Sequence, residues 1–193
     1  DGVLVASVAG SVLGWSDVGV VASTTYGYEV RARDAAGNVS GPGVAAPVTT
    51  PPVSGVSTVT FVADADAYVA QNSANSSFGA ATTLLSDGSP AMRTYLRFAV
   101  SGVSGTVTAA KVRLWVVDPT SNAPQLFGTT TGWSEPTLTW NNQPGAVGSV
   151  LSDLGSVSTG TWIEYPVTTV VTGNGTYAFV LMPQSSNGLD VSS

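Results

Sequence analysis

Apolar residues in this chain alternate with polar ones or form short blocks, and Gly, Ser, Asn, Asp or Pro separates one block from the next. This pattern is typical of short β-strands joined by turns, and it lacks the 3.6-residue period of an amphipathic helix. We predict strands at residues 3–8, 18–22, 26–33, 44–49, 58–63, 67–70, 82–85, 93–100, 109–117, 124–127, 137–140, 162–167 and 176–182. So many short strands predict an all-β fold, either a β-sandwich or a jelly roll.

The composition excludes several kinds of chemistry. The chain has 193 residues, with 43% hydrophobic and 9% charged residues, and contains neither Cys nor His. A Ser-His-Asp or Cys-His nucleophile, a disulfide, and a zinc, haem or iron-sulfur site with Cys or His ligands are therefore all excluded. Burial alone must hold the sandwiches together.

Charge and hydropathy limit the partners. The net charge of −6 argues against nucleic-acid binding, which needs a cationic surface to neutralise phosphates. No apolar run is long enough to insert into a membrane. A surface rich in Ser, Thr, Asn and Gly is typical of secreted β-proteins, and the start at Asp1 suggests a piece of a longer chain.

One uncharged stretch divides the chain. Residues 50–57 contain the consecutive prolines Pro51 and Pro52, which cannot donate hydrogen bonds to a sheet. We predict a semi-rigid linker at 50–57, with one domain at 1–49 and a second at 58–193.

The first domain carries a specific resemblance. Residues 24–43 read TTYGYEVRARDAAGNVSGPG, and they resemble the last two strands of a bacterial fibronectin type III domain, with Tyr26 in the tyrosine-corner position. The opening DGVLVASV is similar to the mid-domain hairpin of that family. The resemblance covers half of such a sandwich, so we expect a longer parent protein, or a neighbouring module or chain that covers the open half.

The second domain resembles a different family. Its stretches ADAYVAQNSANSSFG, WSEPTLTWNNQPG and GTWIEYPVTTVVTGNGTYAFVL are similar, in order, to DNRLRE-type modules, one of which founded an alginate-binding family of carbohydrate-binding modules. The resemblance implies a jelly-roll β-sandwich in a large secreted bacterial protein. Family members usually continue past a GLDVSS-like segment into one more strand, so the last strand is expected to be missing here.

The basic residues of the second domain cluster on two predicted strands. The chain has six Lys and Arg in all, and four of them lie at 93–113: Arg93, Arg97, Lys111 and Arg113. The period of two places Tyr95 and Arg97 on one face of the first strand. It places Lys111, Arg113 and Trp115 on the outward face of the second.

This cluster suggests a site for an acidic polysaccharide. Arginine binds a carboxylate through two parallel hydrogen bonds, and an aromatic ring can stack on a sugar ring. The family resemblance implies a Lys-Arg-Arg group, which we map by strand phase onto Arg97, Lys111 and Arg113. The predicted ligand-binding residues are Arg93, Tyr95, Arg97, Lys111, Arg113 and Trp115. The alternative is that these cations only protect exposed strands from aggregation or pair with acids across the sheet.

Two acidic residues and three tryptophans of the second domain are further candidates for a role. Asp64 and Asp66, at i and i+2, are expected to point the same way, and two carboxylates could contribute to a calcium site; a solvated strand start is the alternative. No other cofactor is required. The sequence favours core positions for Trp140 and Trp162 and leaves Trp133 open.

The functional hypothesis is a non-catalytic carbohydrate-binding module, secreted or at the bacterial cell surface, that binds an acidic polysaccharide such as alginate. No pair of acids is singled out for catalysis, so an enzyme is not expected. The alternative is a structural or adhesive module that assembles with neighbouring modules or identical subunits through its sheet edges.

Overall fold

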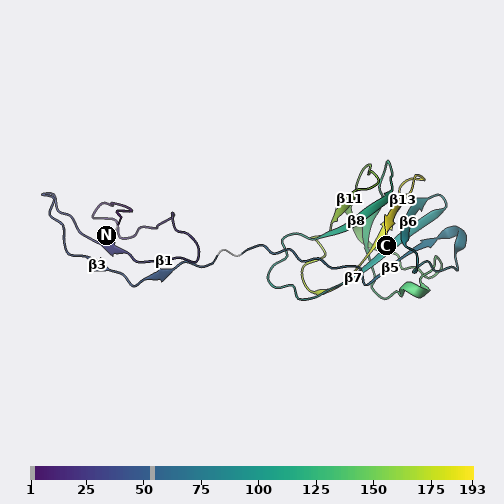
Figure 1. Ribbon diagram of the computed structural model, residues 1–193, viewed down its shortest axis with the longest axis horizontal. Helices are drawn as coiled ribbons and strands as arrows, with labels where there is room; N and C mark the ends of the chain where they lie inside the picture. The colour runs from purple at the N-terminus through teal and green to yellow at the C-terminus, as the bar shows by residue number, and fades with distance from the viewer. Residues whose placement is uncertain (1–2, 53–54) are drawn as a thin grey trace. The chain divides into compact units, whose positions relative to one another are not determined.

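The computed structural model describes residues 3–52 and 55–193. The chain divides into two compact units, Asp1–Thr58 and Val59–Ser193. In the described residues the regular elements are β-strands and two three-residue 3₁₀ helices, Gln71–Ser73 and Glu135–Thr137 (Figure 1). The predicted all-β class is confirmed. Residues 53 and 54 of the predicted linker lie outside the described residues, and the domain limits 1–49 and 58–193 stay a prediction.

The first unit contains two short antiparallel ladders. β1 (Thr25–Tyr26) pairs with β4 (Val48–Thr49), and β2 (Glu29–Val30) pairs with β3 (Gly43–Val44). The Tyr26 hydroxyl accepts a hydrogen bond from the Val21 N–H at 2.7 Å, which is the kind of contact that a tyrosine corner makes.

The strands predicted at 3–8 and 18–22 are wrong. These residues form no β-ladder with another described segment, and their apolar side chains, such as Leu4 and Val18, are exposed. A strand is stable only when a neighbour satisfies its backbone groups and covers one face, so the apolar pattern alone does not produce one here.

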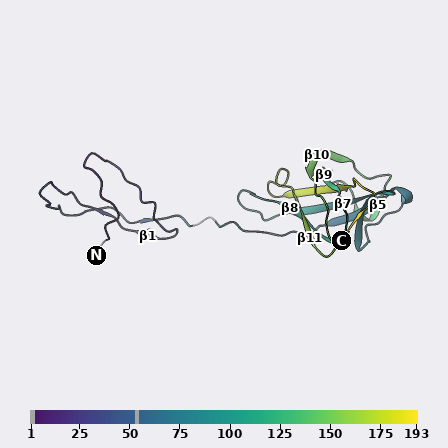
Figure 2. The ribbon, with the colours of Figure 1, turned by 90° about the horizontal axis from the view of Figure 1, so that it is seen from above.

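The second unit is built from nine antiparallel strands, which Figures 1 and 2 show in the right half of each view. They are β5 (Ala65–Ala70), β6 (Thr83–Gly88), β7 (Ala91–Val100), β8 (Lys111–Asp118), β9 (Gln125–Thr129), β10 (Ala146–Ser152), β11 (Trp162–Pro166), β12 (Gly175–Met182) and β13 (Leu189–Ser192). No helix among the described residues is long and apolar enough to cross a membrane.

The nine strands form one curled sheet. Their order is β10-β9-β12-β7-β6-β13-β8-β11, and β5 also pairs with β7. β6 meets β7 only next to their hairpin turn, at the pairs Asp87–Met92 and Gly88–Ala91. The sheet therefore folds over at this hairpin and makes two layers. One layer is β10-β9-β12-β7-β5, and the other is β6-β13-β8-β11.

The main core lies between the two layers. It contains Leu96 of β7 and Phe179 of β12 from one layer, and Leu114 of β8 and Tyr165 of β11 from the other. Because side chains alternate along a strand, the residues that flank these core positions point to the outer faces. The β-sandwich predicted for this part of the chain is confirmed.

A second, smaller core covers the outer face of the first layer. Residues 130–144, which we call the covering loop, bring Trp133 and Leu138 onto Tyr95 of β7 and Val180 of β12. Gly79 allows this close approach, because a Cβ at that position would overlap the carbonyl oxygen of Glu135. One outer face is thus buried under a loop.

Several strand predictions in this unit are wrong. Residues 58–63 form no strand. In the segment predicted at 137–140, Thr137 ends the 3₁₀ helix Glu135–Thr137, residues 138 and 139 have no regular structure, and a turn begins at Trp140. β10 and β13 were not predicted. β10 is interrupted by Gly148 at a positive φ, and β13 is only four residues long, so neither shows a clear alternation.

Candidate functional site

The six predicted site residues fall into two groups on different layers. Arg93, Tyr95 and Arg97 lie on β7, whereas the other three lie on β8. β6 and β13 separate these strands, and the sheet folds over between them. The predicted strand phases are confirmed, but they point to the outer faces of opposite layers. The prediction that the cations of the two strands form one cluster is therefore wrong.

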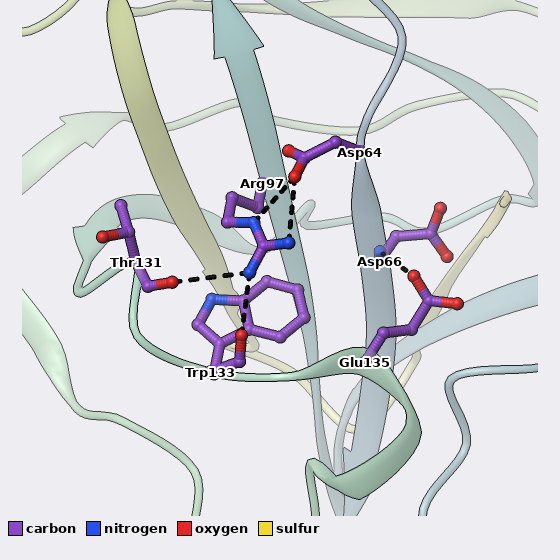
Figure 3. A network of polar contacts seen from close by, with 6 residues as sticks. All are labelled: Asp64, Asp66, Arg97, Thr131, Trp133 and Glu135. Carbon is purple, nitrogen blue, oxygen red and sulfur yellow. Dashed lines mark hydrogen bonds and ion pairs between the residues drawn. The ribbon is translucent and has the colours of Figure 1, made fainter.

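On the first layer, Arg97 is held by internal contacts. Its guanidinium pairs with the Asp64 carboxylate at 2.9 Å, donates to the Trp133 carbonyl oxygen at 2.8 Å, and lies 5.4 Å from the centre of the Trp133 ring. Figure 3 shows the guanidinium between Asp64, Thr131 and Trp133. Arg97 thus ties the covering loop to β7 and has few donors left for a ligand.

Arg93 and Tyr95 have similar roles. The Arg93 guanidinium lies 4.8 Å from the centre of the Trp140 ring and donates to the Gln143 side-chain oxygen. Tyr95 is 1% exposed, and its hydroxyl bonds Gln143 and the Pro144 carbonyl oxygen at 2.8 Å. Burial raises the pKa of Tyr95 to about 12. This face is closed by its own loop.

On the second layer the outer face has no such cover. The outward side chains of β8 and β11 form what we call the open face: Lys111, Arg113, Trp115 and Val117 of β8, and Trp162, Glu164 and Pro166 of β11. The antiparallel register sets Trp162 opposite Trp115 and Glu164 opposite Arg113. β11 ends the strand order, so the open face lies at an edge of the layer.

The aromatic and cationic groups of the open face contact one another and stay exposed. The two tryptophan rings meet edge to face with centres 5.3 Å apart, and the Arg113 guanidinium lies 4.5 Å from the centre of the Trp162 ring. Trp162 is 52% exposed, and the Arg113 side chain is 57% exposed. Stacking orients the guanidinium while much of both groups remains accessible.

Glu164 lies between the two cations of this face. Its carboxylate accepts a hydrogen bond from Lys111 Nζ at 2.5 Å and lies 3.7 Å from Arg113 Nε. The hydrogen bond from Lys111 and the two positive charges hold the pKa of Glu164 below its ordinary value of 4.5. At neutral pH the three groups together carry one net positive charge.

Comparison with known proteins identifies the second unit. The model of carbohydrate-binding module family 96 matches residues 57–193, which is more than half of the chain. The chain belongs to carbohydrate-binding module family 96. In addition, a 40-residue segment is 58% identical to Exoglucanase B of Cellulomonas fimi; it makes up 21% of this chain and 4% of that protein.

The structure also tests the candidate calcium ligands of this family 96 module. Asp64 pairs with Arg97, whereas Asp66 lies opposite Leu96 on the other face of β5 and accepts a hydrogen bond from Ser193 Oγ. Figure 3 shows the two carboxylates pointing in different directions, so the expectation that they share a face is wrong. Among the described residues, no group of three or more acidic, His or Cys side chains is placed to hold a metal ion.

The predictions for the three tryptophans agree with the structure in part. Trp140 packs against the smaller core, as expected, and Trp133, which the sequence left open, is 7% exposed in the same core. Trp162 is not in the core, and that prediction is wrong. The signal was present in the sequence: Glu164 is charged and must face solvent, so a period of two places Trp162 on the same outward face. Trp162 and Glu164 are the site residues that sequence reasoning missed.

Proposed function

We propose that this family 96 module binds an acidic polysaccharide such as alginate on its open face. The observation that carries the proposal is the exposed set of two tryptophans and two cations on adjoining strands, Trp115, Lys111 and Arg113 of β8 with Trp162 of β11. The binding residues proposed here are therefore the β8 group together with Trp162. Arg93, Tyr95 and Arg97 hold the covering loop instead.

The chemistry of the open face fits an acidic sugar chain. Lysine and arginine attract the carboxylate of a uronic acid, and the aromatic rings supply a flat apolar surface for the C–H face of a pyranose ring. An exposed face that includes the edge strand β11 also leaves room for a sugar chain to continue beyond the edge. Neighbouring side chains of the open face thus supply both the cations for the sugar carboxylates and the aromatic rings for the sugar rings.

The proposed role is attachment, without catalysis. A binding module that is joined to other domains raises their effective concentration at a polysaccharide. The similarity to a segment of Exoglucanase B supports a place in a secreted bacterial protein with several domains.

Affinity electrophoresis in gels that contain alginate tests the proposal. We expect Trp162→Ala and the double variant Lys111→Ala/Arg113→Ala each to weaken retention about 10-fold or more, which corresponds to about 1.4 kcal/mol. Added salt should also weaken retention, because it screens exposed charges. Arg31→Ala is the matched control, since Arg31 is a cation in an exposed ion pair of the first unit.

Retention that is equal for all these variants would refute the proposed face. Retention that Arg97→Ala reduces, in protein whose circular dichroism spectrum is unchanged, would move the site to the covered face. The two outcomes are separated by the same gel series.

A structural role is the second candidate, and β10 is the observation that favours it. This strand ends the other side of the strand order, carries no charged residue, and exposes Val147 and Val150. Such an edge can pair with a strand from another copy. Size-exclusion chromatography over a range of concentrations distinguishes the two roles, since growth into larger species without any sugar would support assembly.

A further inference from the structure

Glu164 occupies the place on the open face where a ligand carboxylate would be expected to bind. Its two oxygens lie against Lys111 Nζ and Arg113 Nε. A uronic acid presents the same chemical group, with the same charge and the same two acceptor oxygens. The protein thus carries its own carboxylate between the cations proposed to bind the sugar.

This arrangement is accessible to an incoming chain. The side chains of Lys111, Arg113 and Glu164 are 51%, 57% and 42% exposed, so solvent and ligand reach the pair from outside. Exposed ion pairs contribute little to stability, and their partners exchange readily. A ligand carboxylate can therefore replace Glu164 at the cations without unfolding any part of the sandwich.

We propose that Glu164 is a specificity-determining residue that competes with the ligand carboxylate for Lys111 and Arg113. This inference rests on the proposed function. Glu164 repels an anionic chain and occupies the two cations that would bind it. Displacement of Glu164 therefore requires a chain that offers several carboxylates and also sugar rings that stack on Trp115 and Trp162. Small anions and isolated carboxylates bind weakly for the same reason. Glu164 therefore determines how many carboxylates a sugar chain needs in order to bind the open face.

The opposite role predicts the opposite result. If Glu164 served only to orient Lys111 and Arg113 for the ligand, its removal would loosen both cations and weaken binding. Competition requires that its removal strengthens binding. The sign of one affinity change therefore separates the two roles.

Isothermal titration calorimetry with alginate oligosaccharides tests the competition. We expect Glu164→Gln to bind about 3- to 10-fold more tightly than the wild type, because the amide keeps the shape of the side chain and removes its charge. The salt dependence of binding should become steeper. Glu29→Gln is the matched control, because it removes a carboxylate from the exposed Glu29–Arg31 pair of the first unit.

Titration with a second, uncharged ligand shows whether Glu164 affects the preference for acidic over neutral chains. Carboxyl-reduced alginate keeps the sugar backbone and lacks the charges, so its affinity should be the same for wild type and Glu164→Gln. The ratio of the two affinities, acidic over neutral, should rise 3- to 10-fold in the variant. An equal gain for both polymers would show a general effect on the face and would overturn the competition.

The outcomes also separate this inference from the proposed function. If the wild type binds alginate and Trp162→Ala abolishes binding, but Glu164→Gln binds equally or more weakly, only the role of Glu164 fails. If neither the wild type nor Glu164→Gln binds alginate, the proposed function fails and the role of Glu164 fails with it. Unchanged unfolding of Glu164→Gln by circular dichroism confirms that the variant is folded.

Discussion

Two arginine–tryptophan pairs on opposite layers of the second unit have the same residue types but different surroundings. Arg97 lies over Trp133 and Arg113 lies over Trp162, at similar distances of 5.4 and 4.5 Å. Trp133 is 7% exposed beneath the covering loop, whereas Trp162 is 52% exposed. The ring and the cation are the same in both pairs. Solvent exposure decides whether the pair holds the fold or offers a binding surface.

The covering loop is the physical cause of the difference. On the first layer the loop supplies carbonyl acceptors, such as Trp133 O, that bind the Arg97 donors. Within residues 3–52 and 55–193, Glu164 supplies the only carboxylate or carbonyl oxygen that contacts Arg113 on the second layer. A guanidinium with few internal partners is available to an external anion.

The largest expected effect comes from truncating the two tryptophans. Trp133→Ala should lower the free energy of unfolding by about 3–5 kcal/mol, because it leaves a cavity in the smaller core. Trp162→Ala should lower it by less than about 1 kcal/mol, since it removes only exposed stacking contacts. Urea unfolding followed by circular dichroism measures both. Equal losses would mean that the two faces do not differ as the structure indicates.

The second test truncates the arginine of each pair instead of the tryptophan. Arg97→Ala should cost about 2–3 kcal/mol, because it leaves Asp64 and the Trp133 carbonyl oxygen without a charged partner in a half-buried setting. Arg113→Ala should cost less than about 0.5 kcal/mol, as expected for an exposed residue. The same urea series provides the measurement. A larger loss for Arg113→Ala than for Arg97→Ala would reverse the assignment of the two faces.

The sequence predicts the inside and outside of each strand better than the position of the strand in the sheet. In β7 and β8 the alternation correctly assigns Leu96 and Leu114 inward and Arg97 and Arg113 outward. Alternation is a local property, so a single strand reveals it. The order of strands is not local: β6 and β13 come between β7 and β8, and β13 lies at the far end of the sequence. The prediction that the cations of β7 and β8 form one cluster is wrong for that reason.

The covering loop marks a second limit. Tyr95 has the outward phase, and from the strand alone it is expected to face solvent. It is buried because residues 130–144, which have no strand period, fold over it. Trp162 shows the reverse case, since the same outward phase leaves it exposed where no loop arrives. Strand phase identifies a face, and only the tertiary structure decides whether that face is covered.

The smallest expected effect concerns a third set of charges, on the same layer as the open face. Asp190 of β13 lies near Asp118 of β8 and Asp87 of β6, and its pKa is raised above 3.8 by burial first and then by repulsion from these two carboxylates. Between its unfolded and folded pKa values, the folded chain binds more protons than the unfolded chain. Stability therefore falls as the pH rises through this window, and ionised Asp190 weakens the layer at neutral pH.

Asp190→Asn should consequently raise the midpoint of thermal unfolding slightly at pH 7, with no gain at about pH 3 or below, where the wild-type carboxyl is protonated in both states. Asp153→Asn is the control for the change in net charge, because the exposed Asp153 accepts hydrogen bonds from Gln125 and Gln184 and should not stabilise when neutralised. An equal gain in both variants would trace the effect to the overall charge of −6. A rise in the unfolding midpoint that only Asp190→Asn shows, and only near neutral pH, would place the repulsion among the carboxylates of β6, β8 and β13. The layer would then carry exposed, paired cations at one end of β8 and carboxylates without a cationic partner at the other.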